Sequence, residues 1–93
     1  MKHYIIVKFK ENTDVDGMLP DIRELFQKAL ALEGVTGVEV HRSNSERPNR
    51  HDLMIEMRLT PEGLAVYDGS QMHQDWKAQY GQYIAQKTIF DCE

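Results

Sequence analysis

The spacing of hydrophobic and polar positions along the chain predicts four β-strands. Successive side chains of a strand point to opposite faces, so an apolar residue at every second position marks a buried face. Residues 52–59 follow this pattern clearly, and residues 38–43 and 86–92 follow it over shorter stretches. Residues 3–10 are apolar on both faces near their centre. A strand of that kind is expected to be covered on both faces.

A helix is predicted between the first two strands. Asp14 or Asp16 could cap it, Pro20 is acceptable only in its first turn, and Gly34 would end it as a left-handed cap. Apolar residues recur there at the three- and four-residue spacing of an amphipathic helix. They are Met18, Ile22, Leu25, Phe26, Ala29 and Leu32.

A second helical region follows the third strand and is interrupted. Thr60 and Pro61 form a helix start, and the run from Asp68 through Gly69 to Ser70 breaks that helix. Ser70 can cap another helix, which carries Met72, Trp76, Tyr80 and Tyr83. The element order is therefore β-α-β-β-α-β. This order predicts an α+β, ferredoxin-like fold, in which helices cover one face of a four-stranded antiparallel sheet.

Such an arrangement leaves the other face of the sheet without helices. That face would carry Tyr4, Ile6 and Met54, with the charged Glu56 and Arg58 beside them. An exposed apolar face of this size is typical of an interface. We expect a second copy of the chain to cover it, sheet against sheet, and we interpret the charged residues as ion pairs at the edge of this homodimer contact.

Composition and charge limit the classes of function. The 93 residues fit one domain spanning 1–93, and 41% hydrophobic with 28% charged residues is ordinary globular composition. The formal charge of −4 argues against a general nucleic-acid binder. Cys92 is the only cysteine, no apolar run approaches the length of a membrane span, and no signal-peptide pattern follows Met1. A cytoplasmic location is expected.

Tyr67 and His73 are the main candidates for chemistry. They are six residues apart and would not meet on one continuous helix, but the break between them could turn both side chains into one space. His73 could then accept a proton, and Tyr67 could donate a hydrogen bond to a developing oxyanion. The alternative is that Tyr67 packs in the core and His73 lies at the surface. His3 would face the helices and could line the same cavity.

A pocket between sheet and helices would be lined mainly by apolar and aromatic side chains. The predicted lining residues are Ile5, Val7, Leu53, Ile55, Trp76 and Tyr80. The four histidines are dispersed, and there is no glycine-rich phosphate loop. We therefore expect neither a metal ion nor a cofactor.

Four segments together resemble the stress-responsive A/B-barrel (Dabb) family. They are KHYIIVKFK at residues 2–10, DLMIE at 52–56, LAVY at 64–67 with His73 six residues later, and TIFD at 88–91. The likeness extends over essentially the whole chain. It implies a ferredoxin-like fold that dimerises into a β-barrel, with a cavity between sheet and helices.

The resemblance also implies roles for particular residues. In the plant polyketide cyclases that look similar, a Tyr and a His matching Tyr67 and His73 carry out an aldol condensation, and a His matching His3 lines the site. Those cyclases have a further His on the third strand, where this chain has Leu53.

Three functions stay open at this point. The first is a small-molecule-binding dimer. The second is a cofactor-free enzyme acting on a small carbonyl compound, with His73 as base, Tyr67 as oxyanion donor and His3 assisting. The third is a structural interaction domain. A solvent-reachable cavity of roughly 300 Å³ or more would favour the first two. Convergence of the three side chains on that cavity would favour the enzyme.

Overall fold

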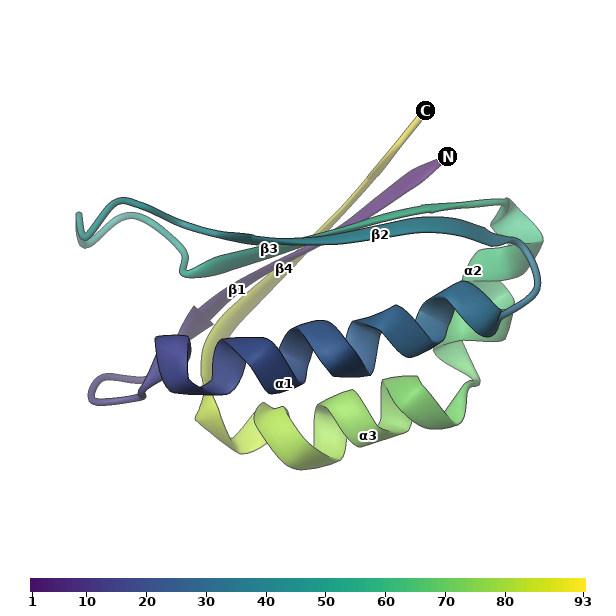
Figure 1. Ribbon diagram of the computed structural model, residues 1–93. Helices are drawn as coiled ribbons and strands as arrows, with labels where there is room; N and C mark the ends of the chain where they lie inside the picture. Colours follow the sequence, from purple (N-terminus) through teal and green to yellow (C-terminus); the bar gives the residue numbers. More distant parts are fainter.

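The computed structural model describes residues 1–93, and its strands form one antiparallel sheet with helices on a single face (Figure 1). The strands are β1 (Lys2–Phe9), β2 (Val35–Arg42), β3 (Leu53–Leu59) and β4 (Ile84–Cys92), in the spatial order β2-β3-β1-β4. β1 is one of the two inner strands and pairs antiparallel with both β3 and β4. The predicted ferredoxin-like α+β fold is therefore confirmed. β2 and β4 each begin earlier in the chain than the pattern of residues had suggested.

The first helix, α1 (Val15–Gln27), begins where Asp14 caps it. The Asp14 carboxylate accepts a hydrogen bond from the Gly17 amide at 3.1 Å, which satisfies one of the free donors at the helix start. The sequence predicts Pro20 in the first turn of this helix. Since α1 starts at Val15, Pro20 instead lies in the second turn. A proline there removes one helical hydrogen bond, to the Asp16 carbonyl.

The prediction that Gly34 caps this helix is wrong. α1 continues as a short 3₁₀ turn, η1 (Lys28–Ala31), and the chain is already extended at Leu32. Gly34 does adopt a left-handed conformation, with φ of +86°, but it serves a close contact: a Cβ atom there would lie 2.8 Å from the Gly63 Cα. The Gly34 carbonyl also accepts a hydrogen bond from the Thr60 amide at 2.9 Å. Gly34 therefore holds the start of the next helix against β2.

The second helical region is divided at the predicted break into α2 (Pro61–Asp68) and α3 (Gln71–Tyr80). A 3₁₀ turn, η2 (Gly81–Tyr83), then leads into β4, so Tyr83 is not part of α3. α1 and α3 run along the same face of the sheet, while α2 lies at one end of it (Figure 1). Phe26 of α1 meets Trp76 of α3 edge to face, with ring centroids 5.0 Å apart. This contact joins the two long helices over the core.

Burial alternates along the two central strands. The helix side of β1 and β3 supplies buried core residues, namely Ile5, Val7, Phe9, Leu53, Ile55, Met57 and Leu59. Their neighbours on the open face, Tyr4, Ile6 and Met54, are only half-buried. β4 forms one edge of the sheet and is exposed over most of its length. None of the helices combines the length with the apolar composition that a membrane span requires.

Candidate functional site

A cleft of about 320 Å³ lies between the β1–β4 pair and the corner where α2 meets α3. It brings together His3, Tyr67 and His73, which come from three different elements. The complete lining is His3, Ile5, Leu64, Tyr67, Asp68, His73, Lys87, Ile89 and Asp91. The cleft is large enough to hold part or all of a small organic molecule.

The corner itself is built by Ser70. Its hydroxyl donates a hydrogen bond to the Tyr67 carbonyl at 2.6 Å and accepts one from the His73 amide at 3.2 Å. The side chain thus ends α2 and begins α3 within one residue. As a result the rings of Tyr67 and His73 lie 4.6 Å apart between centroids. A continuous helix would have separated them.

Tyr67 is buried, and its hydroxyl has no hydrogen-bond partner in the chain. Burial raises the pKa of the Tyr67 phenol well above its ordinary value of 10.0, and the neighbouring Asp68 carboxylate raises it further. The phenol is therefore uncharged at neutral pH and can donate a hydrogen bond. A buried hydroxyl without a partner costs about 1–3 kcal/mol. Such a group in a folded protein calls for an explanation.

His73 is held by the end of α2. Its Nδ1 lies 3.0 Å from the Asp68 carbonyl oxygen. A carbonyl can only accept, so Nδ1 carries the proton in this contact. In the neutral ring, Nε2 is then left as a proton acceptor.

His3 is the third ring of the cleft and is buried, with 6% of its surface exposed. Its Nδ1 lies 2.5 Å from the Asp91 carboxylate, and its ring centroid is 6.0 Å from that of Tyr67. Reasoning from the sequence missed Asp91. The signal that could have found it is the antiparallel pairing of β1 with β4, which sets His3 directly opposite Asp91.

Five of the six predicted lining residues lie elsewhere. Ile5 lines the cleft, whereas Val7, Leu53, Ile55, Trp76 and Tyr80 belong to the buried core. The reason is that these five residues pack in one core cluster with buried residues of α1 and α3. The apolar side chains that line the cleft with Ile5 are Leu64 and Ile89, and Lys87 brings the one cation.

Outside the cleft, one group of side chains has the composition and spacing to hold a metal ion. It consists of Glu39, His41 and Glu56 on the open face of the sheet.

No family model matches the chain, and no curated protein matches its sequence. Solved structures do match. A dimeric ferredoxin-like protein of unknown function from Thermobifida fusca YX has 12% sequence identity and a TM-score of 0.79, over 96% of this chain and 85% of its own.

Two further similar structures belong to proteins with a stated family or activity. A Dabb family protein with a ferredoxin-like fold from Mesorhizobium loti MAFF303099 has 14% identity and a TM-score of 0.74, over 99% of this chain and 93% of its own. An antibiotic biosynthesis monooxygenase has 16% identity and a TM-score of 0.74, over 100% of this chain and 99% of its own. Identities this low show a shared fold alone. The predicted likeness to Dabb proteins is therefore confirmed at the level of the fold: the chain has the ferredoxin-like architecture that a Dabb family protein also has.

Proposed function

We propose that this chain is a homodimeric, single-domain protein that binds a small, largely apolar molecule carrying a carbonyl oxygen. The observation that carries this proposal is the buried Tyr67 hydroxyl, which has no partner in the chain and borders a cleft shared with two histidines. A bound carbonyl oxygen would accept its hydrogen bond and remove the cost of leaving the donor unpaired. A cytoplasmic location belongs to the same proposal.

The walls of the cleft suit the apolar part of such a ligand. Ile5 and Leu64 lie on the sheet and helix sides, and Ile89 of β4 is 47% exposed beside them. Covering this exposed apolar surface would favour binding by about 25 cal/mol per Å² removed from water. Lys87 at the same site could interact with an acidic substituent.

The homodimer part of the proposal rests on the open face of the sheet. Tyr4, Ile6 and Met54 are half-buried there, and Phe90 of β4 is 58% exposed on the same face. The rings of Tyr4 and Phe90 lie 6.3 Å apart and form a continuous aromatic patch. A second copy placed against this face would cover it. The similar protein from Thermobifida fusca is itself described as dimeric.

The binding proposal is tested by purifying the protein without removing small molecules and identifying what it retains by mass spectrometry. We expect a carbonyl compound to co-purify, and we expect Tyr67→Phe to retain roughly tenfold less of it, the equivalent of one hydrogen bond of about 1.4 kcal/mol. Tyr80→Phe is the matched control, because Tyr80 lies in the core and outside the cleft. Equal retention by both variants would contradict the proposal.

A second candidate function is catalysis on the same carbonyl compound, and the His73–Asp68 contact favours it. This contact leaves His73 Nε2 as a base, with its ring 4.6 Å from that of Tyr67. His73 Nε2 would remove a proton from the carbon beside the carbonyl. The electron pair of the C–H bond would move into the C=C bond of an enolate, whose oxygen accepts the Tyr67 hydrogen bond. The enolate carbon could then take the proton back, or attack the carbon of a second carbonyl in the same molecule, whose oxygen would take the proton from His73. This step needs no cofactor.

Exchange of carbon-bound hydrogen for deuterium tests this candidate without knowledge of the substrate. A panel of small aryl 1,3-diketones would be incubated with the protein in D₂O and followed by NMR. We expect exchange faster than in buffer, and a loss of about 10²–10⁴-fold in His73→Ala. His51→Ala, outside the cleft, should exchange at the wild-type rate. Rates that are the same with and without His73 would rule out its role as base.

A further inference from the structure

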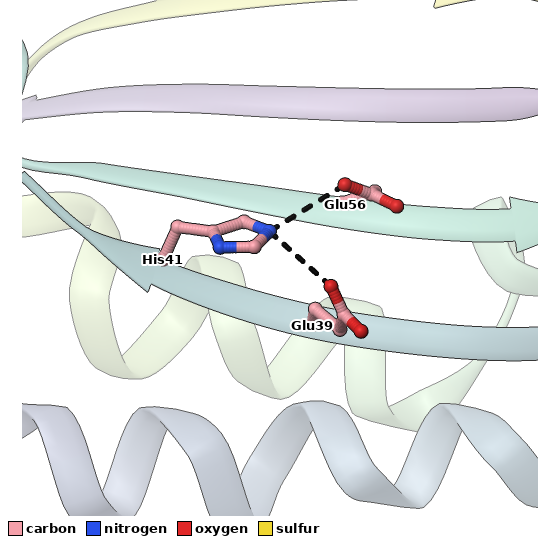
Figure 2. Close-up of side chains that lie close together, drawn as sticks. All are labelled: Glu39, His41 and Glu56. Carbon is pink, nitrogen blue, oxygen red and sulfur yellow. Dashed lines mark ion pairs between the residues drawn. The ribbon is translucent and has the colours of Figure 1, made fainter.

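Figure 2 shows three side chains that converge on the open face of the sheet, and the cleft lies on the other face. Glu39 of β2 and Glu56 of β3 face each other directly across the strand pair, and His41 follows two residues after Glu39. Residues two apart on a strand point to the same face, so all three side chains share one side of the sheet. Two carboxylates placed opposite each other repel unless something positive lies between them.

His41 and the two carboxylates lie at ion-pair distances, which are also the distances between ligand atoms that share a cation. His41 Nε2 lies 3.5 Å from Glu39 Oε2 and 3.5 Å from Glu56 Oε1. A protein hydrogen bond between nitrogen and oxygen is usually about 2.7–3.2 Å long. By contrast, ligand atoms at about 2.1 Å from a tetrahedral zinc ion are about 3.4 Å from one another. The three ligand atoms all lie within 4.8 Å of each other.

Arg58 supports the two carboxylates from the other side. Its guanidinium lies 2.8 Å from Glu56 Oε2 and 3.9 Å from Glu39 Oε1. Each carboxylate therefore turns one oxygen toward Arg58 and the other toward His41. Ligating carboxylates are commonly oriented by partners of this kind, which raise both affinity and order at a metal site. With neutral His41, two carboxylates and one guanidinium leave a local charge that still attracts a divalent cation.

We propose that Glu39, His41 and Glu56 form a binding site for a first-row divalent transition-metal ion such as Zn²⁺. A mixed set of imidazole and carboxylate ligands suits these ions, whereas Ca²⁺ and Mg²⁺ prefer oxygen ligands alone. Glu56 is mostly buried, with 17% of its side chain exposed, and anchors the site. In the single chain the side chains of Glu39 and His41 are about half-exposed, at 54% and 45%, so an ion can reach them at the edge of the proposed dimer contact. The expectation of no metal site came from the distance between histidines along the chain, and this site needs only one histidine.

Titration of the metal-free protein with Zn²⁺, followed by calorimetry, tests the site directly. We expect one ion per chain, and we expect His41→Ala and Glu56→Gln each to weaken binding by more than about tenfold. His73→Ala is the matched control, because His73 lies in the cleft on the other side of the sheet, and it should bind Zn²⁺ as the wild type does. Co²⁺ gives a second readout, because its visible absorption reports coordination by nitrogen and oxygen. The same His41→Ala change should remove that band.

Other outcomes of this titration would overturn the proposal. Absence of saturable binding would do so, and so would binding that is lost in His73→Ala but kept in His41→Ala, since that result would place the ion in the cleft. Circular dichroism of His41→Ala checks that the fold is intact. The result is independent of the ligand bound in the cleft, so either proposal can fail while the other stands.

Discussion

His3 and His41 each lie beside carboxylates, yet their surroundings differ. The His3 side chain is 7% exposed and has a single acidic partner, Asp91, on the helix side of the sheet. The His41 side chain is 45% exposed and lies between Glu39 and Glu56 on the open side. Burial holds His3 beside the cleft, where it contacts the 44% exposed side chain of Asp91. In the single chain the second group is exposed enough for an ion to reach it, so the same residue types suit different roles on the two faces.

The difference extends to the whole of each face. On the helix side the core is apolar, and the Tyr67 hydroxyl at the cleft is unpaired; the other buried polar atom without a partner, His51 Nε2, belongs to the loop before β3. On the open side the polar groups of β2 and β3 contact one another through Arg58 and His41. A buried hydrogen-bonding group that has no partner within the chain points to a ligand. Paired charges around a half-buried apolar patch are typical of a surface that meets another molecule.

The largest effect should come from adjacent isoleucines on opposite faces of β1. Ile5 is 2% exposed toward the helices, whereas Ile6 is half-buried on the open face. We expect Ile5→Ala to lower the free energy of unfolding by about 2–5 kcal/mol, because it removes buried side-chain volume. Ile6→Ala should cost less than about 1.5 kcal/mol at low protein concentration, where a dimer contributes little.

Urea unfolding at two protein concentrations measures the stability of each variant as a single chain and the additional stability that comes from dimerisation. For Ile6→Ala, the additional stability gained at high concentration should shrink, since the change lies in the proposed interface. Equal losses for the two variants at low concentration would mean that the open face is as buried as the core within one chain. The comparison between the faces would then break down.

Alkaline pH should act on the helix side through Tyr67. The pKa of its phenol is raised in the folded state above the ordinary value of 10.0, so the unfolded chain loses this proton first as the pH rises. Stability is therefore fully present below pH 10 and should fall above it, by about 1.4 kcal/mol per pH unit for one such group.

Urea midpoints between pH 9 and pH 11.5 would show this slope, and Tyr67→Phe should remove most of it. A smaller slope should persist from Tyr80, whose pKa is raised by burial and by the nearby Asp21 carboxylate. If Tyr67→Phe kept the full slope, its phenol would be accessible to solvent and the cleft would be more open than described.

Loss of the Ser70 hydroxyl should weaken the corner between α2 and α3. We expect Ser70→Ala to lower the free energy of unfolding by about 1 kcal/mol, the usual effect of removing a helix cap. Ser70→Thr should retain the cap and most of the stability. Thermal unfolding measures both, and ligand retention in Ser70→Ala should fall because Tyr67 and His73 lose their common support.

The smallest effects should separate the two carboxylate–histidine groups. Asp91→Asn removes the charged acceptor beside buried His3 and should cost about 1 kcal/mol of stability. Glu39→Gln changes an exposed ion pair and should alter stability by less than about 0.5 kcal/mol in metal-free protein. The order of these two values, measured by urea unfolding, is the test. A larger loss for Glu39→Gln would mean that the open-face cluster stabilises the fold.

Local patterns in the sequence predicted most of the fold. The alternation of apolar residues on β1 and β3 depends only on the two-residue period of a strand, and the buried faces follow it. The Thr60 and Ser70 caps act within three residues of themselves, so they too could be found from sequence. The position of Pro20 and the role of Gly34 were missed, because the first depends on where α1 begins and the second on contact with α2.

For the candidate site, too, local sequence determined some features and the tertiary structure decided the others. The sequence by itself determined that a break follows Tyr67 and that His73 begins a new helix, since turn and cap residues act locally. Only the tertiary structure decided where the cleft lies, because that depends on which strands α1 and α3 cover. It also paired His3 with Asp91 and set Glu39 and His41 against Glu56. Those contacts join residues far apart in the chain through strand register, which no local pattern specifies.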